Sequence, residues 1–187
     1  MNAKGNIIVV TRTNMIAGFG EKRWNSFMAK LAQKDKYFKD NMIISVTLMP
    51  MEKVITFFDE MTKEFFNNDK GAYSLYGKLG AKSLLSPGGS HQAYMLTKDI
   101  NFFVKFVLPK IWTIFFDTGV FITKFENNII HIKITEIDIK NFDFENIVIG
   151  YNQQAVKIFG RKSVAKRVRS ISSGSDDFYF QLALQDS

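Results

Sequence analysis

Apolar residues recur at helical spacing through the first half of the chain. In the segment 21–33 the large apolar residues fall at i, i+3, i+4 and i+7, which is one face of an amphipathic helix. These residues are Trp24, Phe27, Met28 and Leu31. The segment 51–66 carries a broader apolar stripe, and Pro50 suits the first turn of a helix there. A shorter helix is expected over 73–84, before the break "SPGGS" at 86–90.

The segment 99–116 is apolar on nearly every side. Such a segment is typical of a buried helix, because it offers no polar face to water. Pro109 lies within it, and a proline removes one backbone hydrogen bond and clashes with the preceding turn. We therefore expect a buried helix that Pro109 kinks or divides in two.

The apolar period changes to two after "DTG" at 117–119, which indicates β-strands. A first pair of strands alternates apolar with polar residues, as in "IIHIKIT" at 129–135. Asn127 and Asn128 stand between the two strands and suit a hairpin turn. These features predict an antiparallel hairpin directly after the helices.

A helix and two further strands are expected in the rest of the chain. The helix covers 144–159, and Gly160 suits its C-terminal end. The strands cover 163–172 and 177–184, with a turn at 173–176 between them. Four large apolar residues of the second strand share one face, since alternate residues of a strand point the same way. They are Phe178, Phe180, Leu182 and Leu184.

The order of these segments predicts an α+β fold. A helical N-terminal part is followed by an antiparallel sheet with the chain order β-β-α-β-β. We expect a single domain over 1–187, in which 1–117 is mainly helical and 118–187 forms the sheet with one helix.

Composition agrees with a folded domain. Hydrophobic residues make up 46% of the 187 residues, and 19 Phe require a substantial core. The absence of Cys excludes disulfides, thiol nucleophiles and Cys-type zinc sites, and fits a cytoplasmic location. Neither a signal peptide nor a membrane span is expected, because the longest apolar segment, 100–116, contains Lys and Pro.

Three segments carry a resemblance to a known superfamily. They are "KGNIIVVTRTNMIAGFGEKRWNSFMAKL" near the start, "LPKIWTIFFDTG" before the sheet, and "FENIVIGYNQQAVKIFGRKSVAKRVRSISSGSDDFYFQLAL" at the end. The chain resembles the 4-vinyl reductase-type small-molecule-binding domains and their heme–nitric-oxide-binding-like relatives, which are related to small subunits of TRAPP vesicle-tethering complexes. The resemblance implies a bacterial sensory or regulatory domain that binds a small ligand and pairs with itself or with a signalling partner protein.

Two departures from the superfamily pattern bear on cofactors. Where such domains often carry Gly-Asp and then Cys, this chain has Gly174-Ser175 and then Phe178. The heme-binding relatives ligate iron through a histidine on a helix, whereas His91 follows a loop and His131 points outward from a strand. We therefore expect no heme or other cofactor and no metal site.

The resemblance places a ligand pocket between the central helices and the last helix. The residues expected to line it are Tyr76, Phe103, Trp112, Phe116 and Tyr151. Aromatic side chains at this spacing also arise from ordinary core packing, so the pocket and a plain core are both open.

The run "RKSVAKRVR" at 161–169 is the second candidate site. Its basic residues would suit the phosphate groups of an anionic partner, and the alternative is an exposed edge strand protected by charge. They are Arg161, Lys162, Lys166, Arg167 and Arg169. Nucleic-acid binding is not expected, because no aromatic residue interleaves with them for base stacking.

Other motifs do not indicate catalysis. "GRKS" at 160–163 is similar to the end of a phosphate-binding loop, but Ala155 stands where that motif needs glycine. His131 has no accompanying nucleophile pattern, and Asp176 with Asp177 suits a turn. The leading hypothesis is a non-enzymatic sensory or regulatory domain that binds a small apolar ligand between helices and sheet. The alternatives are a structural or protein-interaction module without ligand, and a phosphate or nucleic-acid binder acting through 161–169.

Overall fold

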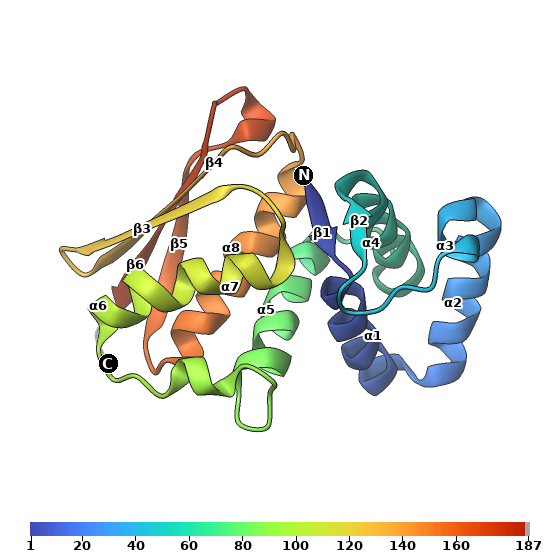
Figure 1. The fold of residues 1–187 in the computed structure, drawn as a ribbon, viewed down its shortest axis with the longest axis horizontal. Helices are drawn as coiled ribbons and strands as arrows, with labels where there is room; N and C mark the ends of the chain where they lie inside the picture. Colours follow the sequence, from blue (N-terminus) through green and yellow to red (C-terminus); the bar gives the residue numbers. More distant parts are fainter. Residues whose placement is uncertain (186–187) are drawn as a thin grey trace.

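The computed structural model describes residues 1–185 and shows a mixed helical and antiparallel-sheet architecture (Figure 1). The elements of its first part are β1 (Asn2–Lys4), α1 (Asn6–Phe19), α2 (Glu21–Lys34), α3 (Lys36–Asp40), β2 (Leu48–Pro50), α4 (Met51–Phe66) and α5 (Gly71–Leu85). Those that follow are η1 (Gln92–Met95), α6 (Ile100–Phe102), η2 (Phe103–Val107), α7 (Leu108–Phe115), β3 (Val120–Glu126), β4 (Ile129–Thr135), α8 (Phe142–Ile158), β5 (Lys162–Arg169), η3 (Ile171–Ser173) and β6 (Phe178–Gln185). The predicted α+β class is confirmed.

An aromatic cluster holds the N-terminal helices together. Trp24 and Phe27 of α2 project from one face and are almost fully buried, as the helical spacing predicts. Their rings contact Phe57 of α4 at centroid distances of 6.1 and 5.8 Å. Charged residues on the outer side of α2 pair with α4, for example Lys30 with Glu64 at 2.9 Å. The amphipathic pattern therefore specifies both the helices and their packing partner.

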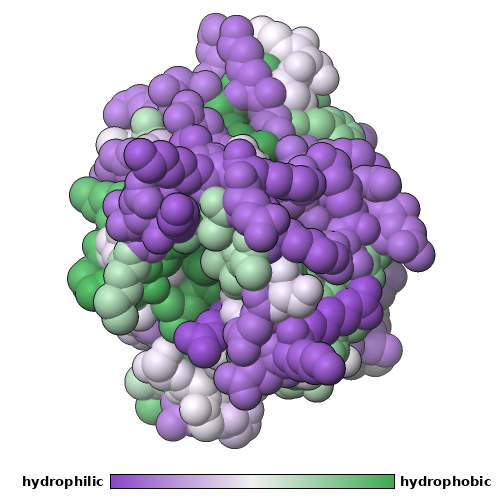
Figure 2. Space-filling view, turned by 90° about the vertical axis from the view of Figure 1, so that its right-hand side faces the viewer, coloured by the Kyte–Doolittle hydropathy of each residue, from purple (hydrophilic) through white to green (hydrophobic). Residues whose placement is uncertain are grey.

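The segment between α3 and β2 leaves several apolar side chains exposed to solvent. They are Met42, Ile44, Val46 and Leu48. Figure 2 looks onto this end of the molecule and shows hydrophobic residues at one side of a largely hydrophilic surface.

The C-terminal sheet has the spatial order β3-β4-β6-β5, and all neighbours are antiparallel. Its inner face is fully buried at Ile132, Phe178 and Phe180, as the period of two predicts. α7 and α8 cover this face, and α5 packs along α8 (Figure 1). The predicted turn at Asn127 and Asn128 joins β3 to β4, and both residues have positive φ angles of 50° and 61°, which suits a tight hairpin.

α5 and α8 cross at a distance that only glycine permits. A Cβ on Gly77 would lie 2.0 Å from the carbonyl oxygen of Ile147, and one on Gly150 would lie 2.2 Å from that of Ser74. Each glycine thus removes a side chain where the backbone of the other helix passes. The backbones of the two helices are in direct contact.

The segment around Pro109 differs from its prediction. α6, η2 and α7 form one helical run, and η2 is a π-helical turn that ends just before the proline. A π-turn changes the hydrogen-bond pattern at the place where Pro109 cannot donate. The prediction of burial on nearly every side is wrong, because Phe102 and Phe106 are 48% and 52% exposed.

Some features of the fold were not predicted from the sequence. α1 and the short β1–β2 pair are absent from the expected elements, and β1 also connects to the end of α7 through a bridge between Ala3 and Phe116. Within residues 1–185, no helix has the length and apolar character needed to cross a membrane. Division into a single domain stays a prediction.

Candidate functional site

A cavity of about 60 Å³ lies where α1, α4, α5, α7, α8 and β3 meet. The side chains that line it are almost all apolar or aromatic. They are Ile7, Val10, Thr11, Phe58, Tyr76, Gly77, Gly80, Leu108, Ile111, Trp112, Phe115, Phe116, Phe121, Ile147, Val148, Tyr151 and Asn152. No Lys, Arg, Asp or Glu side chain is among these lining residues, so the cavity offers no charge to a ligand.

Most of the residues expected in the pocket meet at this cavity. Tyr76, Trp112, Phe116 and Tyr151 come from three helical segments and all line it. Phe103 does not line it: the side chain lies on the π-helical turn and stacks on Phe159 at a centroid distance of 4.5 Å. Its placement next to Phe159 puts it in the core on the other side of α7.

Trp112 forms the aromatic wall of the cavity. Its indole Nε1 donates a hydrogen bond to the carbonyl oxygen of Thr118 at 2.9 Å, which fixes the ring. The ring packs on Phe116 at 4.2 Å and on Phe121 at 5.5 Å between centroids. The wall is therefore rigid and dry rather than adaptable.

Two tyrosine hydroxyls face the cavity with different surroundings. The Tyr76 hydroxyl lies 3.0 Å from the Thr62 hydroxyl, and burial raises the pKa of Tyr76 to about 12. Tyr151 is 8% exposed, and its buried hydroxyl has no hydrogen-bond partner in the structure. Burial raises the pKa of Tyr151 as well, so both phenols stay protonated at neutral pH.

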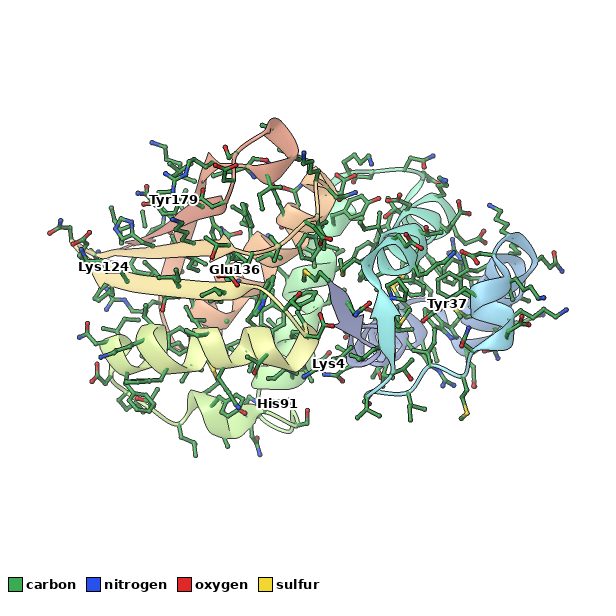
Figure 3. All side chains as sticks on the ribbon, turned by 45° about the horizontal axis from the view of Figure 1, so that its top comes forward. Lys4, Tyr37, His91, Lys124, Glu136 and Tyr179 are labelled. Atoms are coloured by element: carbon green, nitrogen blue, oxygen red, sulfur yellow. The ribbon has the colours of Figure 1, made fainter. Side chains whose placement is uncertain are left out.

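Both histidines lie away from the cavity. His91 precedes η1, and its Nδ1 lies 2.9 Å from the hydroxyl of the neighbouring Ser90. His131 is on β4, and its Nδ1 lies 2.6 Å from the hydroxyl of Tyr179 on β6. Figure 3 shows His91 and Tyr179 in well-separated parts of the molecule. Among residues 1–185, no group of His, Cys, Asp and Glu side chains converges as a metal site would require.

Arg167 of the basic run points inward. Its Nε lies 3.0 Å from Oε2 of the buried Glu145, and its Nη2 donates a 2.7 Å hydrogen bond to Asn146. The guanidinium also covers the ring of Phe142 at 3.6 Å. Burial lowers the pKa of Arg167, and the negative charge of Glu145 opposes that change. Arg167 therefore joins β5 to α8.

The remaining basic residues do not form one site with Arg167. Arg169 makes two hydrogen bonds to Asp177, at 2.6 and 2.9 Å, which lower the pKa of that carboxyl group. Arg161 lies 3.5 Å from Asn128 at the hairpin turn. Lys162 and Lys166 are exposed along β5. Charge therefore occurs on both faces of this edge strand.

Several residues of the site were missed in the sequence. Thr11 and Gly80 line the cavity but lie on helical faces that carry no pattern to mark them. Glu145 and Asn152 occupy the apolar stripe of α8, where a buried polar residue is a signal that can be read. Glu145 accepts a hydrogen bond from Ser170 at 2.8 Å, which contributes to holding the charge inside.

Comparisons with known proteins identify the fold. No family model and no curated protein sequence matches the chain. Among solved structures, an H-NOX protein from S. oneidensis in the Fe(II)NO ligation state has a TM-score of 0.72 and 15% identity, covering 98% of this chain and 99% of that chain. An Fe(II) unliganded H-NOX protein from K. algicida has a TM-score of 0.68 and 9% identity, covering 98% and 97%.

The chain therefore has the fold of an H-NOX, or heme–nitric-oxide-binding, domain. A Cs H-NOX mutant gives a similar result, with a TM-score of 0.71, 12% identity, and coverage of 98% of this chain and 97% of that chain. These findings support the heme–nitric-oxide-binding-like part of the predicted resemblance. They do not support the part that concerns 4-vinyl reductases and TRAPP subunits.

The residues at the cavity do not fit a heme. Heme iron in proteins is held by His, Cys, Met or Tyr, and the lining residues include only tyrosines of that set. Ligation by Tyr151 requires a phenolate, which burial disfavours. The volume of about 60 Å³ is far below the roughly 300–1,000 Å³ of sites for larger ligands. No cationic side chain lines the cavity to pair with the carboxylates of a heme.

Proposed function

We propose that this chain is a non-enzymatic sensory domain that takes a small apolar ligand into the cavity between its helices and sheet. The observation that carries the proposal is the dry, uncharged cavity whose walls come from α1 through α8. A ligand there contacts segments from both parts of the chain, so its binding can bias their packing. The H-NOX-like fold supports a sensory role, because the S. oneidensis protein is described with a bound diatomic molecule, NO.

The size of the cavity limits the ligand. One water molecule occupies about 30 Å³ in the liquid, so about 60 Å³ holds a molecule of a few non-hydrogen atoms. Apolar cavities of this kind stay dry and take up small apolar molecules or xenon. The proposed ligand is thus much smaller than a cofactor.

Xenon binding tests the proposal directly. In methyl NMR spectra of the isotope-labelled protein under xenon pressure, we expect shifts at Ile111 and Val148, which line the cavity. Leu31 and Val54 are buried outside the cavity and serve as controls that do not shift. Xenon-dependent shifts that are absent, or equal at all four residues, would contradict a ligand-binding cavity.

A protein-interaction module without ligand is the second candidate. The exposed Phe102 and Phe106 favour it, since large exposed aromatics on one helix edge suit a homodimer or signalling partner. This candidate predicts no specific xenon effect at the cavity. Phosphate or nucleic-acid binding through 161–169 has weaker support, because Arg167 and Arg169 already pair with carboxylates. The cytoplasmic location stays a prediction.

A further inference from the structure

The Tyr151 hydroxyl is an unpaired polar group in an otherwise apolar cavity. It is buried without a hydrogen-bond partner, whereas the Tyr76 hydroxyl in the same cavity is paired with Thr62. Buried polar groups in native proteins nearly always have a partner, because an unpaired one loses its interactions with water and gains none. The exception therefore indicates a partner that is not part of the chain.

The surroundings of Tyr151 leave space beside its ring. Gly80 faces the ring without a side chain, and a Cβ built there would lie 3.6 Å from Cδ2 of Tyr151. Phe115 meets the ring edge-on at 5.3 Å between centroids. The amide of Asn152 already donates to the carbonyl oxygen of Val148 at 2.9 Å, so it does not serve the hydroxyl as a donor group. A ligand in the cavity is the natural partner for the hydroxyl.

We propose that the ligand is an uncharged, mostly apolar molecule of a few non-hydrogen atoms with one hydrogen-bond acceptor, which the Tyr151 hydroxyl binds. This inference rests on the proposed function and specifies the ligand class of the same cavity. The ligand is uncharged because no charged side chain lines the cavity. It carries an acceptor because the raised pKa keeps the phenol protonated and able to donate.

Acetone and isobutene test this ligand class as a matched pair. The two molecules have nearly the same shape, and only acetone carries an oxygen acceptor. Binding is followed by NMR titration of the indole Nε1–H signal of Trp112, which lines the cavity. The chain has 2 Trp, and the signal of Trp24, outside the cavity, is the internal control.

The measured quantity is the ratio of the two affinities in three proteins. Tyr151→Phe removes the unpaired hydroxyl and keeps the ring, and we expect it to lower the acetone-to-isobutene ratio by roughly two- to tenfold. Tyr76→Phe removes a hydroxyl that is already paired with Thr62, and we expect it to leave the ratio unchanged. Both variants keep the aromatic packing, so both are expected to fold, and thermal melts check this.

Failure of this inference differs from failure of the proposed function. If both molecules bind and Tyr151→Phe leaves the ratio unchanged, the cavity binds ligands but the acceptor proposal is overturned. An equal loss in Tyr76→Phe also overturns it, because the effect is then not specific to Tyr151. If neither molecule nor xenon binds the parent protein, the cavity proposal falls and this inference with it.

Discussion

Glu145 is a buried charge on which the junction of α8 and β5 depends. Its carboxylate pairs with Arg167 at 3.0 Å and accepts from Ser170. Removing one member of a buried ion pair leaves the other charge without compensation, which costs about 3–5 kcal/mol. We expect Glu145→Gln to lower the free energy of unfolding by about 3 kcal/mol, measured by chemical denaturation.

An exposed ion pair provides the control for this variant. Lys36 and Asp40 lie 3.7 Å apart on α3 with largely solvated side chains. Asp40→Asn should change the free energy of unfolding by less than about 0.5 kcal/mol. Equal effects of the two substitutions would show that the Glu145 pair is not specially important.

Single residues of the cavity were partly predictable from the sequence. Trp112 and Tyr151 follow from the aromatic pattern together with the superfamily resemblance, and both line the cavity. Phe103 follows the same pattern but packs on Phe159, because its position on a π-turn is not visible in the spacing. The inward direction of Arg167 was equally hidden, since its partner Glu145 lies on another element.

Two glycines on α5 have opposite roles at the level of the helix. Gly77 touches the backbone of α8, so Gly77→Ala forces the helices apart and should lower stability by about 3 kcal/mol. Gly80 has room for a methyl group, with its nearest neighbours at 3.6 and 3.7 Å. Gly80→Ala should raise stability by about 0.5–1 kcal/mol, because alanine restricts the unfolded chain and favours helix.

Thermal and chemical denaturation of both variants measure these effects. The two sites share one helix, so a difference in sign isolates the helix crossing from helix propensity. If Gly77→Ala proved as stable as Gly80→Ala, the close contact between α5 and α8 would be refuted.

Elements with a strong local pattern were predictable, and those that depend on distant partners were not. α8 and the hairpin turn have local signals in Gly160 and in the pair Asn127-Asn128, and both occur as expected. β1 is only a short strand held by β2 and by a bridge from Ala3 to Phe116. No local pattern reveals such a strand, because its partners are far away in the sequence.

The whole molecule carries a natural probe in each of its parts. Trp24 lies in the core of α2 and α4, and Trp112 lies at the cavity beside the sheet. The buried apolar residues form a continuous cluster across both parts. We therefore expect one cooperative unfolding transition, as for a single domain of this size.

Two single-tryptophan proteins measure this cooperativity. Trp24→Phe reports on Trp112, and Trp112→Phe reports on Trp24. Within each variant, the denaturation midpoint from fluorescence should coincide with that from far-ultraviolet circular dichroism. Separate midpoints within one variant would show that the helical part and the sheet part unfold independently.

The α+β class followed from the change of apolar period, but the cavity did not follow from any one segment. Its walls come from residues as distant in sequence as Val10 and Tyr151, and only the packed chain brings them together. The misfit with heme likewise became clear only when His91 and His131 could be placed outside the cavity.

The glycine crossing of α5 and α8 has a consequence for how the cavity can change shape. Gly77 lies on the cavity wall and is pressed against the backbone of Ile147, so this wall cannot retreat. The opposite walls, from α1 and α7, meet the cavity through side chains. An occupant that needs more room therefore pushes in one direction, as against a fixed anvil, and the resulting movement falls on α1 and α7.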